Sequence, residues 1–97
     1  MKHRVARAGS WLYDGSVRRP VYIVELDYDF WYEIAKADGT LEPGEKPELN
    51  PQGLQYYVCF REVPAEPPLW VDSPGHHSID GACEHAQSKV PSQISWQ

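Results

Sequence analysis

The stretch VYIVELDYDFWYEIA, residues 21–35, decides the fold expected of this chain. Every even position in it, from Tyr22 to Ile34, is apolar or aromatic. Such alternation is typical of a β-strand with one buried face, because successive side chains on a strand point to opposite sides. The stretch is long for a single strand. We therefore expect either one long, twisted strand or a strand that bends near residues 27–29.

A hairpin is predicted before this stretch, because Asp14-Gly15 is a strong signal for a tight turn between two strands. If the turn has two residues, the numbers of facing residues sum to 29. The expected pairs are Val5–Val24, Arg4–Glu25, Lys2–Asp27 and Trp11–Arg18. One conflict remains, since Pro20 would face Gly9 at a site that needs an N–H donor. A bulge or a longer loop would relieve it.

Further along the chain, the sequence predicts a loop followed by two strands. Residues 40–53 hold three prolines and two glycines, a composition typical of a loop. The alternation resumes from Leu54 to Val63, with Tyr56, Val58 and their even-numbered neighbours on one face. A shorter strand is expected at 69–71, before the turn signal Ser73-Pro74-Gly75.

The C-terminal part of the chain predicts one helix and a short edge strand. Ser78 is a suitable N-cap for a helix over about 79–90. Apolar side chains recur on that segment at helical spacing, at Ile79, Ala82, Cys83, Ala86 and Val90. Pro91 ends the helix. The tail SQISWQ alternates again, with Ile94 and Trp96 facing inward.

Together these elements predict an α+β fold, in which an antiparallel sheet of four to five strands carries one C-terminal helix, about 79–90, on one face. With 97 residues, the chain is expected to form a single domain, 1–97. It holds no apolar run long enough to span a membrane and no secretory signal, so we expect a cytoplasmic protein that is not bound to membranes. Two cysteines are too few for a disulfide scaffold, and we expect free thiols.

The charges are unevenly distributed along the sequence. Residues 1–20 hold five bases and one acid, whereas residues 21–97 hold four bases and thirteen acids, giving net charges of +4 and −9. Nucleic-acid binding requires a basic surface. The acidic body argues against it and leaves only weak binding through the basic N-terminal segment. The alternative is that this segment lies against the acidic body.

No pattern in the sequence demands a catalytic residue, a metal or a cofactor, and we predict none of the three. The group His76, His77, Cys83 and His85 has a spacing that fits no zinc site. The acidic residues Glu25, Asp27, Asp29 and Glu33 are interpreted as a solvated strand face.

The aromatic residues are the more informative feature. Trp31 and Tyr57 fall on the polar faces of their predicted strands, and Arg61 lies on the same face as Tyr57. Exposed aromatic and arginine side chains are typical of interface hot spots. We therefore predict Trp31, Tyr57 and Arg61 as partner-binding residues. The alternative is that these aromatics are buried under the loop or under PAEPPLW, residues 64–70.

These observations favour a non-enzymatic protein-interaction module that self-associates, as a homodimer across the polar face or a sheet edge, or that binds another protein. One alternative is a small-ligand or catalytic pocket of roughly 300 Å³ or more between the sheet, the helix and loop 40–53. The other alternative is weak nucleic-acid binding through the basic N-terminal segment.

Overall fold

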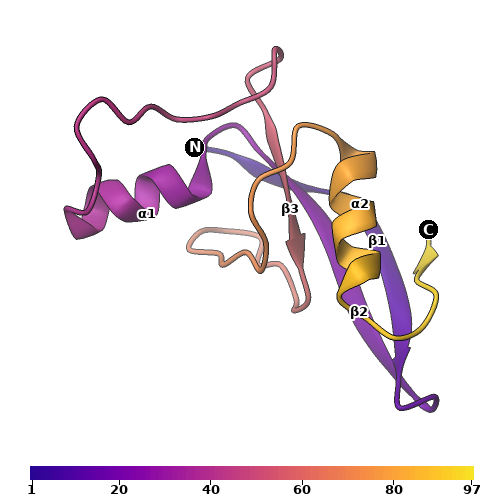
Figure 1. The fold of residues 1–97 in the computed structure, drawn as a ribbon. Helices are drawn as coiled ribbons and strands as arrows, with labels where there is room; N and C mark the ends of the chain where they lie inside the picture. Colours follow the sequence, from indigo (N-terminus) through magenta and orange to yellow (C-terminus); the bar gives the residue numbers. More distant parts are fainter.

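The computed structural model describes all residues, 1–97, and has a four-stranded antiparallel sheet with two helices (Figure 1). The elements in chain order are β1 (His3–Tyr13), β2 (Val17–Leu26), α1 (Phe30–Asp38), β3 (Gln55–Cys59), α2 (Ile79–Ser88) and β4 (Ser95–Trp96). The strand order is β3-β2-β1-β4, and α2 packs on one face of the sheet. The predicted α+β class is confirmed. Neither helix has the length and apolarity that crossing a bilayer requires.

Helix α1 replaces the second half of the strand predicted over 21–35. Asp29 caps this helix, because its carboxylate accepts a hydrogen bond from the Tyr32 N–H at 3.1 Å. Gly39 ends it in the left-handed conformation, with φ of 73°. The strand prediction is wrong after Leu26. Aromatic residues at even positions matched the period of a strand, but the capping residues Asp29 and Gly39 determine that the segment is a helix.

The hairpin register is the predicted one near its open end and differs by one residue toward its tip. Asp14 and Gly15 have positive φ, as a tight hairpin turn requires, but Ser16 adds a third residue, so Tyr13 pairs with Val17. A bulge between Val5 and Arg7 restores the predicted register. The pairs Arg4–Glu25 and Val5–Val24 are therefore confirmed, and Trp11 faces Arg19 instead of Arg18.

The added residue also resolves the conflict at Pro20. In the observed register Pro20 lies opposite Ser10, which pairs with Ser95 of β4 on the other side of β1. The backbone groups of Ser10 thus serve the β1–β4 ladder, and the β1–β2 ladder loses no donor.

Strand β3 is shorter than predicted, and residues 69–71 form no strand. The chain after β3 turns back instead and lies beside β3 as an irregular segment. The Asp72 N–H donates to the Val58 carbonyl at 2.8 Å, and Tyr56 and His76 exchange two backbone hydrogen bonds. This segment therefore pairs with backbone hydrogen-bonding groups at the outer edge of β3, although it is not a regular strand.

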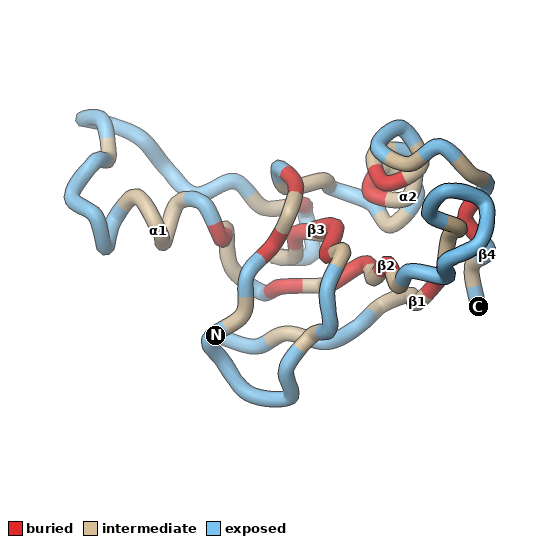
Figure 2. Tube along the Cα trace, turned by 90° about the horizontal axis from the view of Figure 1, so that it is seen from below, coloured by how far each residue is buried: buried red, intermediate tan, exposed pale blue.

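The sheet is buried on both faces, which the sequence analysis did not anticipate. Val21 and Ile23 of β2 pack under α2, whereas Val24 and Leu26 face a second core on the opposite side. Figure 2 shows buried residues along both β2 and β3. The even-numbered faces predicted for β2 and β3 therefore lie on opposite sides of the sheet, because Ile23 pairs with Val58 and Val24 pairs with Tyr57.

The C-terminal elements agree with the sequence prediction. Ser78 caps α2 by accepting a hydrogen bond from the Gly81 N–H at 3.0 Å, and the apolar stripe of α2 faces the core. Ile94 is buried beside it. The tail forms β4 against Gly9, where a Cβ atom would lie 2.7 Å from Cε3 of Trp96. A side chain at position 9 would thus displace the edge strand.

Helix α1 extends away from the sheet (Figure 1). Only its first residue, Phe30, is buried. The tip of the β1–β2 hairpin projects at the opposite end of the molecule. The chain is accordingly elongated, with extents of 47 × 26 × 24 Å.

Candidate functional site

Three aromatic rings form a cluster at the root of α1. Phe30 and Trp31 begin the helix, and Trp70 reaches them from the irregular segment that follows the proline-rich turn. The ring centroids lie 5.0 Å apart for Phe30–Trp31, 5.4 Å for Phe30–Trp70 and 5.3 Å for Trp31–Trp70, all edge to face. Phe30 is buried, whereas Trp31 is 37% and Trp70 is 46% exposed.

Hydrogen bonds connect this cluster to strand β3. The Trp31 indole N–H donates to the Ser73 carbonyl at 2.8 Å, and the Ser73 hydroxyl accepts from the Val58 N–H at 2.8 Å. The Phe30 N–H donates to the Tyr57 hydroxyl oxygen, also at 2.8 Å. The Trp31 ring is therefore held by a hydrogen bond, and the Trp70 ring is held by edge-to-face packing on Phe30 and Trp31. Such ordering reduces the conformational entropy that binding would cost.

An open groove of about 470 Å³ is lined by both tryptophans. Its lining comprises Trp31, Trp70, Val71, Asp72, Ser73 and Pro74. We call these six residues the indole groove. Trp31 also lines a second hollow of about 270 Å³, which it shares with Asp29, Tyr32, Ala35, Glu45, Lys46 and Glu48.

The surroundings of the indole groove are acidic. Residues 27–48, which include α1 and the loop after it, hold seven acidic side chains and two lysines. Asp72 within the groove pairs with Arg61 at 2.8 Å and accepts from the Phe60 N–H at 2.8 Å. Its charge is thereby balanced, and the acidic residues that share the second hollow with Trp31 are Asp29, Glu45 and Glu48.

The structure places the three predicted partner-binding residues differently. Trp31 lies in the indole groove, and Arg61 is exposed beside it through its ion pair with Asp72. Tyr57 is fully buried, and burial raises the pKa of its hydroxyl. Its side chain has no surface to offer a partner, because the segment around Val71 covers that face of the sheet.

Sequence reasoning missed Trp70 as a member of the site. The signal was its position directly after the proline-rich turn, where an exposed tryptophan has no helix or strand to explain it. Its meeting with Trp31 depends on the path of two irregular segments, which no sequence periodicity describes.

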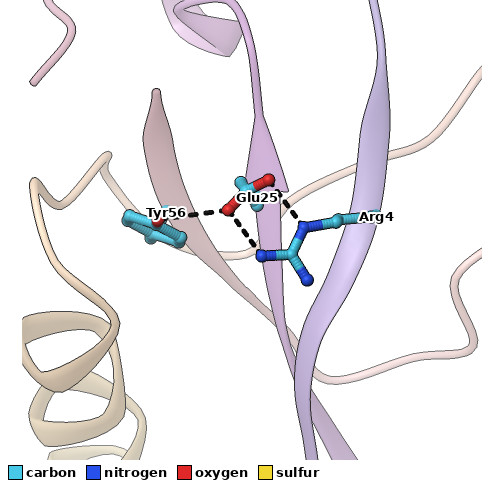
Figure 3. Close-up of polar contacts among 3 residues, drawn as sticks. All are labelled: Arg4, Glu25 and Tyr56. Atoms are coloured by element: carbon cyan, nitrogen blue, oxygen red, sulfur yellow. Dashed lines mark hydrogen bonds and ion pairs between the residues drawn. The ribbon is translucent and has the colours of Figure 1, made fainter. Parts of the chain in front are cut away.

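A second polar cluster joins three strands on the α2 face of the sheet (Figure 3). Arg4 of β1 forms two hydrogen bonds with Glu25 of β2, of 2.7 and 2.9 Å, and the Tyr56 hydroxyl of β3 donates to Glu25 at 3.1 Å. The Arg4 guanidinium holds the pKa of the Glu25 carboxyl below its usual range. The charges of Arg4 and Glu25 neutralise each other, so we interpret this network as one that stabilises the register of the three strands.

The other residues with reactive side chains do not assemble into a site. The rings of His76 and His85 lie 5.0 Å apart, and burial, with His85 nearby, lowers the pKa of His76. No group of three or more potential ligands is placed to hold a metal ion. Cys59 is buried, which raises the pKa of its thiol to about 12, and its thiol donates to the Trp70 carbonyl at 3.3 Å. A thiol held protonated is a poor nucleophile.

The pocket considered between the sheet, the helix and loop 40–53 corresponds to an open hollow of about 310 Å³. Its lining comprises Asn50, Gln52, Tyr56, His77, Ser78, Ile79 and Asp80. Only Tyr56 among them is a Phe, Tyr or Trp residue, and its hydroxyl is already bonded to Glu25. The aromatic lining expected of such a pocket is therefore found at the indole groove instead.

Comparisons with protein-family models, with curated proteins and with solved structures found no match to this chain. The polar side chains of the indole groove, Asp72 and Ser73, are engaged in structural hydrogen bonds. What the groove presents to a ligand is therefore aromatic and apolar surface within an acidic region, an arrangement suited to binding.

Proposed function

We propose that the chain is a non-enzymatic protein-interaction module whose indole groove holds a segment of another polypeptide. The observation that supports this proposal is the pair Trp31 and Trp70, perpendicular at 5.3 Å and partly exposed, with Trp31 hydrogen-bonded to Ser73 and Trp70 packed on the buried Phe30. Tryptophan is enriched among the residues that dominate binding energy, because it buries a large area at a small cost in side-chain entropy.

The segment that fits this groove carries an arginine or lysine next to an aromatic or aliphatic side chain. Indole faces attract cations, and the acidic side chains of residues 27–48 strengthen that attraction. The apolar neighbour would pack against the exposed indole surface and Pro74 in the groove. A purely acidic segment would be repelled.

We place this activity in the cytoplasm, and we include a second copy of the chain among the partners. The cytoplasmic location is supported by the two cysteines, which are free thiols in the structure. Self-association is the partner choice expected from the sequence.

A peptide titration tests the proposed function. The probe is a fluorescein-labelled hexapeptide of alternating arginine and tyrosine, with a glutamate-for-arginine version as its control, and binding is measured by fluorescence anisotropy. We expect the arginine peptide alone to bind, and Trp70→Ala to weaken it by about tenfold or more. Trp96→Phe, a tryptophan change outside the groove, should leave binding unchanged.

Equal affinities for the wild type and Trp70→Ala would refute the proposal, as would equal binding of the two peptides. Circular dichroism of Trp70→Ala establishes that the variant is folded. If that variant does not fold, Trp31→Phe, which removes the indole N–H and reduces the aromatic surface, gives the same comparison with a smaller expected loss.

A further inference from the structure

The tip of the β1–β2 hairpin presents a second exposed surface of aromatic, aliphatic and cationic side chains. Tyr13 and Val17 face each other across the hairpin and are 53% and 47% exposed. The Arg19 guanidinium lies over the Tyr13 ring, 5.5 Å from its centroid, and Trp11 contacts the same ring edge to face. We call Tyr13, Val17 and Arg19 the tip surface.

The cations at this end are not neutralised by carboxylates of the chain. Arg19 has no ion pair, and Arg18, on the opposite face of the hairpin, donates to the Ser10 hydroxyl. Lys89, at the end of α2, lines the same hollow as Tyr13 and is also without an ion pair. Asp14 is the one acidic residue in that hollow.

The tip surface and the indole groove complement each other. Large hydrophobic side chains that are exposed occur at six positions, and four of them belong to these two surfaces: Tyr13, Val17, Trp31 and Trp70. One surface is cationic, and the other lies in a region of seven acids and two lysines. The tip surface is thus the kind of segment that the groove is proposed to hold, an arginine beside an aromatic residue and a valine.

We infer that the indole groove of one copy binds the tip surface of a second copy, so that the chains associate head to tail. This inference rests on the proposed function and names its partner. Figure 1 shows α1 and the hairpin tip at opposite ends of an elongated molecule, so a tip cannot reach the groove of its own chain. Each copy therefore offers one tip and one groove, which generates an open chain or a ring.

The other surfaces through which two copies could associate are covered or poorly suited to pairing. The polar face expected to form a dimer is covered, since Tyr57 and its neighbours are buried beneath the segment around Val71. The outer edge of β3 is already hydrogen-bonded to Asp72 and His76. The free edge of β1 is interrupted by the bulge between Val5 and Arg7, and bulges hinder pairing between sheet edges.

Two variants with complementary defects test the inference. The double variant Tyr13→Ser/Arg19→Glu removes the tip surface and keeps the groove, whereas Trp70→Ala removes the groove and keeps the tip. Sedimentation velocity over a range of concentrations measures the mass of each protein. We expect the wild type to grow in mass with concentration and each variant alone to remain a monomer.

Mixing the two variants gives the decisive result. One intact groove and one intact tip remain in the mixture, so we expect a dimer with one copy of each variant and no larger species. Arg18→Glu is the matched control for the single variant Arg19→Glu, because it reverses a charge on the opposite face of the same hairpin. We expect Arg18→Glu to self-associate at least five times more tightly than Arg19→Glu.

Several outcomes would overturn the inference. The inference fails if the wild type stays monomeric at the highest attainable concentration. It also fails if the tip variant self-associates as strongly as the wild type, or if the two folded variants form no mixed dimer. The arginine–tyrosine peptide separates this failure from that of the proposed function. If the peptide still binds the tip variant, the groove recognises cationic segments of another protein. If the peptide binds neither the wild type nor the tip variant, both proposals fail.

Discussion

At the scale of single residues, Glu25 contributes to stability through its charge. Arg4 lowers the pKa of the Glu25 carboxyl from its ordinary 4.5, mainly through their hydrogen bond, and Tyr56 adds a second donor. The ionised form is therefore favoured in the folded state. Its contribution to stability is complete above pH 4.5 and is lost as the pH falls through the lowered value.

We predict that Glu25→Gln flattens the acid dependence of stability. Urea midpoints measured from pH 7 to pH 2 should fall less steeply below pH 4.5 in the variant than in the wild type. Glu84→Gln, at an exposed position on α2, serves as the control and should keep the slope of the wild type. Parallel curves for the wild type and Glu25→Gln would contradict this role of the carboxylate.

Tyr57 acts at the same scale by accepting a hydrogen bond in the core. Tyr57→Phe removes the acceptor of the Phe30 N–H and leaves that donor unsatisfied at the start of α1. We predict a loss of about 1–3 kcal/mol in the free energy of unfolding, measured by urea denaturation. Tyr22→Phe, whose hydroxyl bonds Glu62 at the surface, should cost much less. Equal losses in the two variants would refute the assignment.

The residue-level contacts that could be predicted from the sequence are those that follow from strand pairing. The Arg4–Glu25 pair was predicted correctly because the bulge between Val5 and Arg7 offsets the extra residue of the turn. Trp11–Arg18 was predicted wrongly, since whether Ser16 belongs to the turn or to the strand changes the register by one residue. Tyr57 was placed on a surface because the chain that covers it has no periodicity.

At the scale of elements, α1 depends on Asp29. Its carboxylate accepts from the Tyr32 N–H at the first turn of the helix and from the Glu48 N–H, 2.8 Å away, in the loop that returns to the sheet. One side chain therefore both starts the helix and ties down the loop that follows it. Beyond Phe30, α1 is supported by Ile34, which is partly buried against the core, and by the hydrogen bond from Trp31 to Ser73.

We predict that Asp29→Ala destabilises α1 by about 0.5–2 kcal/mol while the sheet remains folded. Backbone chemical shifts should show reduced helicity over Phe30–Asp38 and unchanged strand shifts in β2. Asp38→Ala, at the other end of the helix, should not reduce helicity, because an acid there opposes the helix dipole. Unchanged shifts over α1 in Asp29→Ala would contradict the prediction.

The two helices differ in how far the sequence determined them. Helix α2 was predictable because its cap, its apolar stripe and the following proline all agree. Helix α1 was missed, since its apolar residues also satisfy a period of two and only the caps at Asp29 and Gly39 distinguish the alternatives. Capping residues deserved more weight there than the alternation of aromatic side chains.

At the scale of the whole molecule, opposite charges gather at two ends, although Lys2 and Arg4 of the basic segment lie away from the tip, beside Asp27 and Glu25. The acidic end holds α1 and its loop, and the basic end holds the hairpin tip with Lys89. The attraction between such ends on different copies is screened by salt. The head-to-tail association inferred above is therefore expected to depend on ionic strength.

We predict that raising the salt concentration from about 0.05 to about 0.5 M weakens self-association by roughly threefold to tenfold, because the screening length falls well below the width of the contact. Sedimentation equilibrium at several salt concentrations measures the change. Stronger association at high salt would indicate an apolar contact alone and would contradict the contribution of Arg19.

The charge distribution and the fold class were readable from the sequence, but the two-sided burial of the sheet was not. The signal was the run Val21–Leu26, where the odd positions Val21 and Ile23 are as apolar as the even ones. Such runs are typical of strands covered on both faces. What covers the second face is an irregular segment, and its path follows from tertiary packing that local patterns do not describe.

The central position of β2 has a consequence for how the molecule opens. Each of the two cores has six buried residues, and β2 supplies two of them to each. A core of that size does not stay folded alone, so losing one removes half the support of the strand that the other needs. The two cores should thus open as one cooperative unit, and the amides of Ile23 and Val24 should exchange with deuterated solvent only through global unfolding, while those of α1 exchange through local fraying.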